Sequence, residues 1–551
     1  MKLVTNLIMA AFGVSLLAVV ASADPSTTNI IASGTAITNS VTWSATNVHL
    51  MGGPVFVVSN GVLNIEAGTI VKGVTSSTNA AEIAALYVCR GGKIYANGTA
   101  NSPIIFTSIN DVDVTDPGDL GIYDRGLWGG IILFGKARLN TASLLDGNAA
   151  TPKYDVYEGL STNVFAGGQQ AFLFGSDDDE DNSGVLRYVS IRHGGKKLES
   201  NKEINGLSMC GVGRGTTIEF VESYAIADDG FEWFGGTVNT RYLVSAFNDD
   251  ETFDTDEGYR GKNQFWFAIQ ESGARDRGFE FNGEPDGVGT NATLKGKFEV
   301  YNATIIGAGT NTGGNNNNAM NLKGFASPQV YNSIFTDFAQ RGVAIDKSTY
   351  TNLLSGDADF KDNLWWGFTA GNTIANICIS NDFQYVFTNA GFNNDITNPQ
   401  LRSIARLDTG LLDPRPEAGS PALLGTRLPP ATSQFLPVTY KGAFNTVNWA
   451  ADWTTLGAYG IMSGNGAGTP RDELLISIQP STDLSTAISG QLGVCINTLP
   501  GWNYQVQTST NLAGWTNIGS LIHGSGAMKY LYDAAITSEP SRYYRVRALK
   551  P

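Results

Sequence analysis

The fold is decided by three short segments that repeat one pattern: Gly230-Phe231-Glu232-Trp233, Thr252-Phe253-Asp254-Thr255 and Gly278-Phe279-Glu280-Phe281. In each, a small or turn residue precedes an apolar residue, a variable residue and usually a second apolar residue. The first apolar residues of all six copies are Leu207, Phe231, Phe253, Phe279, Met320 and Val343, spaced 24, 22, 26, 41 and 23 residues apart. A period of this length is typical of one coil of a β-solenoid. The sequence therefore predicts an all-β chain, built mainly as a right-handed parallel β-helix.

Side chains alternate between the two faces of a strand, so the repeat also predicts which residues face inward. The aromatic residues of each copy, such as Phe231 and Trp233, are expected in the core. Glu232, Asp254 and Glu280 then form one outward column, which we call the acidic ladder, with neighbouring rungs about 4.8 Å apart. Carboxylates at that spacing raise each other's pKa unless a cation or a basic side chain lies between them.

The acidic ladder has two interpretations, a ligand site or an ion-paired solvated sheet. Carboxylate ligands favour Ca²⁺ over transition metals, so calcium is the predicted cofactor of a ligand site. The candidate metal ligands are Asp249, Asp250, Asp254 and Asp256, and the candidate ligand-binding residues are Asp228, Asp229, Trp266 and Arg260.

Three activities are compatible with such a face. In a polysaccharide lyase, Ca²⁺ would join the ladder to a uronate carboxylate, and Arg260, Lys262 or Arg277 would remove the proton. In a glycosidase, two carboxylates of Glu232, Asp254 and Glu280 on adjacent rungs, roughly 5 Å apart, would suit a retaining pair. In a non-catalytic surface protein, the face would bind a glycan by hydrogen bonding and by stacking on tryptophans.

The composition excludes other classes of protein. The chain has 551 residues, of which 65 are glycine and 16% are charged, and its net charge is −15. Nucleic-acid binding needs a basic surface, so nucleic acid is not an expected partner. Only three histidines are present, which argues against a histidine-built zinc centre. A polysaccharide or another cell-surface component is the expected partner.

The order of segments predicts an exported protein. Residues 1–23 combine Lys2, an apolar run and small residues up to Ala23, as in a cleavable secretory signal. Residues 24–463 are assigned to the β-helix with its caps, 464–470 to a Gly-rich linker and 471–551 to a small antiparallel β-sandwich. No later segment has the composition of a membrane span. We expect the mature chain outside the cell or on its surface.

The four cysteines, Cys89, Cys210, Cys378 and Cys495, are each more than a hundred residues apart. Such spacing fits neither a metal knuckle nor a small disulfide framework. Buried thiols are the favoured interpretation. Export also permits disulfides, and the spacing does not choose among the three possible pairings.

Four stretches carry a family resemblance: residues 126–137 (Gly-Leu-Trp-Gly-Gly-Ile-Ile-Leu-Phe-Gly-Lys-Ala), 180–192, 203–207 and 258–261. They resemble a family of exported bacterial parallel β-helix surface proteins, and the likeness implies a fold and export rather than a reaction. Residues 504–512 and 542–546 are similar to fibronectin-III-like C-terminal modules of secreted proteins. A weaker likeness to polygalacturonases rests on Asp228-Asp229 and Asp249-Asp250. The Arg192-His193-Gly194 segment precedes these pairs and no Arg-Ile-Lys follows, which speaks against that hydrolytic scheme.

Together these features predict a secreted or cell-surface β-helix protein with a structural or glycan-binding role and no catalysis. The alternative is a calcium-dependent carbohydrate-active enzyme, either a polysaccharide lyase or a glycosidase, that uses the acidic ladder.

Overall fold

The structure is a computed structural model. It describes residues 27–464 except 76–81, 142–152, 158, 200–201, 274, 286–287, 311, 313–315, 407–411 and 432. Further on it describes residues 476–480, 492–497, 503–509, 515–523, 528–533 and 543–549. Residues 1–23 and 465–470, predicted as signal and linker, lie outside the described part.

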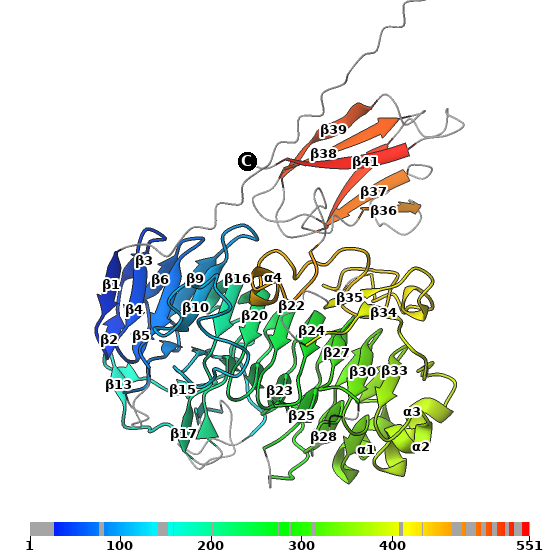
Figure 1. Cartoon of the computed structure of the whole chain (residues 1–551), viewed down its shortest axis with the longest axis horizontal. Coiled ribbons are helices and arrows are strands. Elements are labelled where there is room, and N and C mark those ends of the chain that lie inside the picture. Colours follow the sequence, from blue (N-terminus) through cyan, green and yellow to red (C-terminus); the bar gives the residue numbers. More distant parts are fainter. Residues whose placement is uncertain are drawn as a thin grey trace, which may run out of the picture.

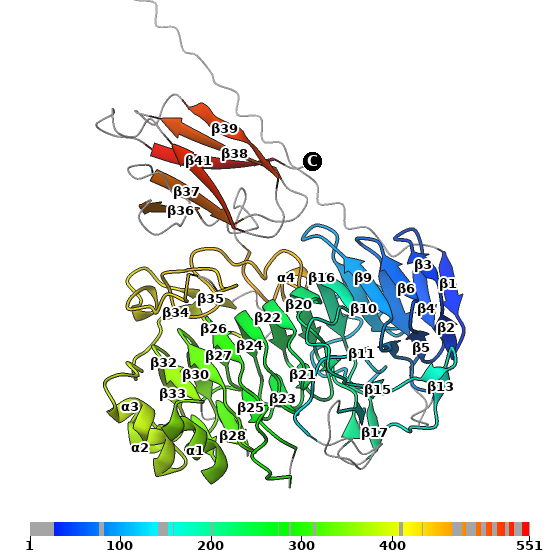
Figure 2. The same cartoon turned by 180° about the vertical axis from the view of Figure 1, so that it is seen from behind.

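Ten strands, one per coil, form the first sheet of a parallel β-helix (Figures 1 and 2). In sheet order they are β2 (Thr35–Ile37), β5 (Val55–Val57), β8 (Leu86–Val88), β11 (Ile131–Phe134), β19 (Leu207–Cys210), β21 (Phe231–Phe234), β23 (Phe253–Asp256), β25 (Phe279–Asn282), β28 (Met320–Lys323) and β31 (Val343–Ile345). Neighbouring strands pair in parallel, as the repeat predicts.

The second sheet has seventeen strands and covers the two other faces of the helix. One face contains β3 (Ser40–Trp43), β6 (Val62–Ile65), β9 (Lys93–Asn97), β26 (Glu299–Tyr301), β29 (Gln329–Tyr331) and β32 (Asp359–Lys361). The other contains β1 (Thr28–Ile31), β4 (Val48–Met51), β7 (Ile70–Gly73), β10 (Ile104–Ser108), β27 (Thr304–Ile306), β30 (Ile334–Phe338) and β33 (Leu364–Phe368). Four long strands join the two faces: β16 (Gly184–Arg192), β20 (Thr217–Tyr224), β22 (Asn239–Ala246) and β24 (Lys262–Ile269).

Each long strand turns a corner at one aromatic residue with a left-handed backbone. These residues are Tyr188, Phe220, Tyr242 and Phe265, with φ between 49° and 58°. Residues before the corner pair on one face and residues after it pair on the other. Such φ values are uncommon outside glycine, so the stacked corners require support from the surrounding packing. The rings supply it, because Phe220 stacks on both Tyr188 and Tyr242 with centroids 4.4 and 4.3 Å apart.

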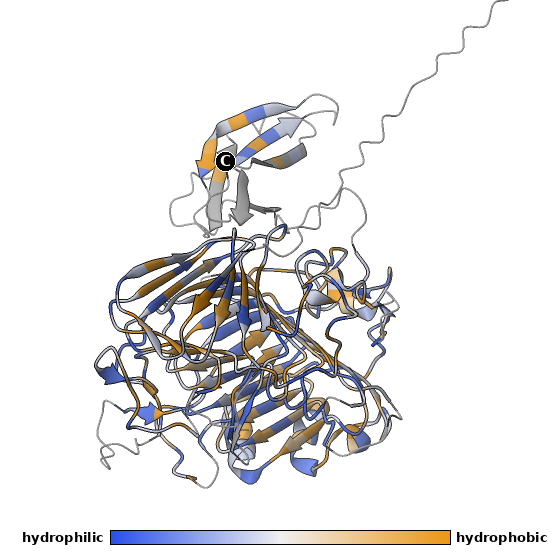
Figure 3. Ribbon diagram, turned by 60° about the vertical axis from the view of Figure 1, so that its left-hand side comes forward, coloured by the Kyte–Doolittle hydropathy of each residue, from blue (hydrophilic) through white to orange (hydrophobic). Residues whose placement is uncertain are grey.

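The interior follows the predicted alternation of side chains. Apolar and polar residues alternate along the strands (Figure 3), and Phe231, Trp233 and Phe253 are fully buried. Phe231 stacks on Phe253 with ring centroids 5.5 Å apart, and Trp233 stacks on Trp266 at 5.1 Å. Stacks of this kind contribute about 0.5–1.5 kcal/mol each beyond the area they bury. The rigid core therefore fixes the direction of the outward side chains.

Short helices close the end of the coils that follows β31 (Figure 1). They are α1 (Lys347–Ser355), α2 (Ile374–Ile377), η2 (Asn381–Gln384) and α3 (Tyr385–Thr388), and their buried residues Leu353, Ile377 and Phe383 join the central core. No helix in the described part is long and apolar enough to cross a membrane.

The chain then returns along the flank of the second sheet, through β34 (Leu401–Ser403), β35 (Asp413–Pro416), η3 (Pro421–Leu423) and α4 (Thr455–Ala458). Trp449 and Trp453 pack edge-on against Phe220. This returning segment covers apolar side chains that the corner of the sheet would otherwise expose.

The remaining strands are short hairpins and a C-terminal module. The hairpins pair β12 (Asp155–Val156) with β15 (Leu173–Phe174), β13 (Phe165–Ala166) with β14 (Gln169–Gln170), and β17 (Lys197–Glu199) with β18 (Lys202–Glu203). The C-terminal sheets contain β36 (Ile476–Pro480), β37 (Leu492–Asn497) and β40 (Met528–Asp533), and separately β39 (Thr516–His523), β38 (Asn503–Ser509) and β41 (Tyr543–Leu549). Both are antiparallel, and their packing as a fibronectin-III-like sandwich stays a prediction.

Three of the cysteines, Cys89, Cys210 and Cys378, are buried thiols, which agrees with the favoured interpretation. Burial raises the pKa of Cys89 and of Cys378 to about 12. These thiols therefore stay protonated and unreactive at neutral pH.

Candidate functional site

The acidic ladder lies in one column of the first sheet. Glu232 of β21 pairs with Asp254 of β23, and Asp254 pairs with Glu280 of β25. Ser208 precedes the column and Asn321 continues it. The prediction that these three carboxylates share one column is confirmed. The column is less exposed than a solvent-facing strand edge would be, because Glu232 is buried and Asp254 and Glu280 are half-buried.

A second polar column runs beside the ladder, on the turns that precede the strands. The amide of Gly206 donates to the carbonyl of Asp229 (2.9 Å), and the amide of Gly230 donates to the carbonyl of Glu251 (3.0 Å). The turns can pack closely because Gly230 has no side chain, since a Cβ there would lie 2.3 Å from Ser245 Oγ. The turn residues are thereby stacked in register like the strands. The acidic face, as we call both columns together, comprises Asp228, Asp229, Glu232, Asp250, Glu251, Asp254, Asp276 and Glu280.

Among the described residues, three groups of carboxylates each place one oxygen per member within 4.8 Å of the others. The groups are Asp228, Asp229 and Asp250; Asp229, Glu232 and Asp254; and Asp250, Glu251 and Asp276. Asp229 and Asp250 each belong to two groups, so the three form one continuous cluster. Sets of carboxylate oxygens suit Ca²⁺, which accepts six to eight oxygen ligands at flexible geometry. The residues present therefore fit the predicted cation.

Burial makes these negative charges costly. Burial raises the pKa of Asp254 well above its ordinary value, and repulsion from Glu280 adds to the shift. Burial also raises the pKa of Asp229 and of Glu251, each with a neighbouring aspartate as the next cause. Within the described part, Oδ1 of Asp254 is buried without a hydrogen-bond partner. A cation or a proton at this position would relieve both costs.

Two basic side chains form ion pairs at one end of the acidic face. Arg277 lies 2.5 Å from Glu251, 3.3 Å from Glu280 and 3.4 Å from Asp276. Lys323 lies 3.4 Å from Glu280. Burial alone would lower the pKa of Arg277, but its three carboxylate partners raise it above its ordinary value. Arg277 therefore stays protonated and acts as a fixed positive charge.

Neutral polar groups form the opposite end. The side-chain amide of Asn205 donates to Glu232, and Ser208 Oγ lies 2.9 Å from the hydroxyl of Tyr157. Asn205 is fully buried, so it holds Glu232 in place without adding charge. The acidic face thus runs from Asn205 and Ser208 through the carboxylate cluster to Arg277 and Lys323.

The structure corrects several sequence predictions. Trp266 is fully buried and its Nε1 donates to Thr240 Oγ1 (2.9 Å), so the prediction that it binds a ligand is wrong. Asp249 lies outside the three carboxylate groups and pairs with Arg125 at 3.4 Å. Asp256 also lies outside these groups, at the far end of β23.

Two of the predicted bases face other partners. Arg260 pairs with Asp179 (2.7 Å) and donates to the carbonyl of Arg138. Lys262 begins β24 of the second sheet, with its Nζ 3.8 Å from Glu299. The structure brings only Arg277 of the predicted bases to the acidic face.

The residues of the site that were not predicted include Asp276, Lys323 and Asn205. Asp276 could have been found, because Asp276-Arg277-Gly278 occupies the same place in its coil as Asp228-Asp229-Gly230. The positions of Lys323 and Asn205 in the sequence do not indicate a place in the site, because their contacts depend on how far their side chains extend.

A pH dependence of stability follows from Asp276. Burial raises the pKa of Asp276 to about 7, although the charge of Arg277 lowers it in part. The pKa of an aspartate in the unfolded chain is near 3.9. Between these values the folded state binds more protons, so the free energy of unfolding falls as pH rises. We expect the thermal unfolding midpoint, measured in a chelator, to fall from pH 5 to pH 8, and to fall less in Asp276→Asn. A midpoint that rises over this range would contradict the assignment.

Comparison with known proteins adds one finding. A family model described as a pectate-lyase-like β-helix domain matches residues 34–394, which is more than half of the chain. The searches of curated proteins and of solved structures each gave no match. The matched segment contains the whole acidic face.

Proposed function

Because the chain belongs to the pectate-lyase-like β-helix domain family, we propose that its acidic face binds an acidic polysaccharide through Ca²⁺ without cleaving it. In this proposal the protein acts outside the cell or on its surface, in keeping with the signal-like residues 1–23. The C-terminal module would be an accessory to the β-helix.

One observation carries the proposal: Asp229, Glu232 and Asp254 converge within 4.8 Å, with Asp229 and Glu232 buried and Asp254 half-buried. The repulsion among them is relieved when a divalent cation binds. Three carboxylates leave coordination positions of Ca²⁺ open, because the ion takes six to eight oxygens. A uronate carboxylate and a sugar hydroxyl are suitable ligands for those positions.

The surroundings of Arg277 favour binding over lyase chemistry. Elimination from a uronate needs a base that accepts the proton of the carbon next to the carboxylate. Arg277 is held by three carboxylates, and its raised pKa makes it a poor proton acceptor. Arg260 and Lys262 are directed to Asp179 and Glu299 instead. A permanent cation is better suited to pairing with an anionic ligand.

Glycoside hydrolysis is the second candidate, and it rests on Asp276. A general acid works best with a pKa near the working pH, and Asp276 has a pKa of about 7 beside Asp250 and Glu251. In that reaction a protonated Asp276 would donate to the leaving oxygen while an ionised neighbour acts on the sugar.

Electrophoresis through gels that contain polygalacturonate tests the proposal. We expect the protein to be retarded with Ca²⁺ and to migrate freely with a chelator. Products are examined in parallel by ultraviolet absorbance for unsaturated ends and by a reducing-end assay. Unsaturated products would establish a lyase, and reducing ends without absorbance would establish a hydrolase. Retardation that survives the chelator would overturn the role of calcium.

A further inference from the structure

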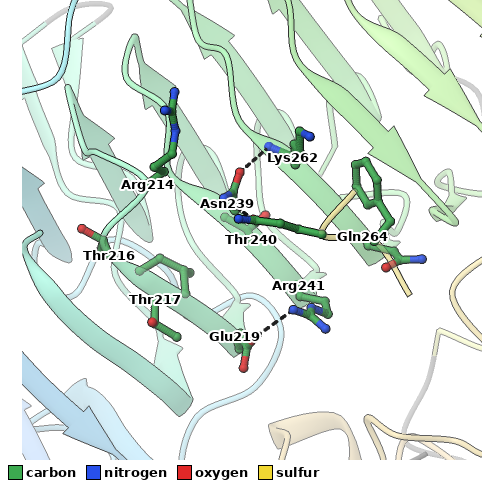
Figure 4. A pocket seen from close by; sticks show the side chains of 12 residues that line it. Arg214, Thr216, Thr217, Glu219, Asn239, Thr240, Arg241, Lys262 and Gln264 are labelled. Carbon is green, nitrogen blue, oxygen red and sulfur yellow. Dashed lines mark hydrogen bonds and ion pairs between the residues drawn. The ribbon is translucent and has the colours of Figure 1, made fainter. Parts of the chain in front are cut away.

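A pocket lies on another face of the β-helix (Figure 4). It has a volume of about 150 Å³ and is formed by the first halves of β20, β22 and β24 together with Gln434 and Phe435 of the returning segment. The acidic face belongs to the ten-stranded sheet, whereas this pocket lies on the seventeen-stranded sheet. The two sites are therefore separate.

The pocket is basic, although the chain as a whole is strongly acidic. Its ionisable lining consists of Arg214, Arg241 and Lys262 against Glu219. Arg214 also pairs with Glu180 at 2.5 Å, so Arg241 and Lys262 carry the positive charge that faces the pocket. Polyanions are repelled by the bulk of a chain with net charge −15, so a local excess of positive charge marks a place where an anionic group is favoured.

The one acid of the pocket does not neutralise it. Arg187 and Arg241 share the carboxylate of Glu219, and Nη2 of Arg241 lies 3.3 Å from it. Burial alone would raise the pKa of Glu219, but the two arginines lower it below its ordinary value. Glu219 thus stays ionised, and two guanidinium groups still face one carboxylate.

Lys262 is held in position while its ammonium group stays accessible. Its backbone amide donates to Asn239 Oδ1 (2.9 Å), and the side-chain amide of Asn239 donates to Gln434 (2.6 Å). The side chain of Lys262 is 40% exposed, and its ion pair with Glu299 is long, at 3.8 Å. An incoming anion can therefore pair with Lys262 at little cost.

The size and lining of the pocket indicate the ligand. A cavity of about 150 Å³ is large enough to admit one six-membered ring. Asn239 and Gln434 offer hydrogen-bonding groups for hydroxyls, and Phe435 offers an apolar surface beside Lys262, whose Nζ lies 5.9 Å from the ring centroid. We propose that this basic pocket binds one acidic sugar residue, with its carboxylate or sulfate group between Arg241 and Lys262. Such binding needs no metal ion.

Calorimetry on the full chain in a chelator tests the pocket apart from the calcium site. The probes are glucuronate, galactose 6-sulfate and neutral glucose. We expect one or both charged sugars to bind, glucose not to bind, and Arg241→Gln to weaken binding at least about tenfold through the loss of a charged hydrogen-bond donor. The tighter of the two charged sugars identifies the anionic group. Affinity should also fall as salt is raised.

The controls separate binding from folding. Lys262→Gln, at a more exposed position, should weaken binding in the same direction if Arg241→Gln fails to fold. Lys347→Gln removes the same charge on the exposed surface of α1 and should leave affinity unchanged. Asp254→Asn, in the proposed calcium site, should also leave the affinity for the sugar unchanged. The pocket and the calcium site are therefore tested independently, and either proposal can fail without the other. Equal binding of glucose, absence of binding by both charged sugars, or no effect of either pocket variant would overturn the proposal.

Discussion

Asp254→Asn should abolish binding of Ca²⁺ to the acidic face, with a loss of affinity of at least about a hundredfold. Affinity at oxygen sites varies over several decades with the number of charged ligands. Asp254 belongs to the carboxylate group with Asp229 and Glu232, and its Oδ1 is buried without a hydrogen-bond partner in the described part. Titration calorimetry with Ca²⁺ on the wild type and the variant measures the effect.

The same variant should be more stable than the wild type in a chelator at pH 8. The amide removes a carboxylate whose ionised form is disfavoured by burial and by Glu280. We expect the free energy of unfolding to rise, because a raised pKa means that the fold disfavours the ionised carboxylate that the amide replaces. Loss of Ca²⁺ binding together with a gain in stability is expected if Asp254 is a metal ligand. A loss of stability is expected if Asp254 instead belongs to a structural ion pair.

Asp256→Asn is the matched control for this variant. Asp256 lies on the same strand, β23, but outside the three carboxylate groups. It should retain Ca²⁺ affinity within a few-fold of the wild type. If the wild type binds no Ca²⁺, or if Asp256→Asn loses binding as fully as Asp254→Asn, the calcium site is wrong.

Arg277→Gln should destabilise the chain by about 1–3 kcal/mol at neutral pH, because the half-buried guanidinium makes charged hydrogen bonds to acceptors that the variant leaves unpaired. The variant leaves Glu251, Glu280 and Asp276 without their common cation. Denaturant unfolding measures the loss. The loss should shrink at pH 5, because the carboxylates can then take up protons instead.

Arg275→Gln provides the control two residues away. Arg275 makes an exposed hydrogen bond to Thr312 (2.8 Å), so its loss should change stability by less than about 0.5 kcal/mol. Equal destabilisation by both variants would contradict the inference that Arg277 stabilises the acidic face through its ion pairs.

The repeat by itself determined the inside and the outside of the coils. Alternation along a strand is a local property with period 2, and parallel stacking copies it from one coil to the next. The positions of Phe231 and Trp233 in the core and of Glu232, Asp254 and Glu280 in one column could therefore be predicted without a structure. They are as predicted.

The tertiary structure decided how the residues between the strands are used. Arg260 and Lys262 follow Asp254 closely in sequence, but the chain turns a corner at Glu257 and Gly258, with φ of 53° and 81°, and Lys262 then starts a strand of the other sheet. Nearness along the chain was therefore a poor guide to nearness to the acidic face.

The contacts made by the turns and by the long side chains could not be predicted from the repeat either. Coils differ in length, as the 41 residues between Phe279 and Met320 show, so neither turn register nor side-chain reach follows from a period. Only the folded chain brings Asp229 to Asp254, and Arg277 to three carboxylates. The sequence determined a ladder of acids, and packing of the turns made that ladder a cluster able to hold a cation.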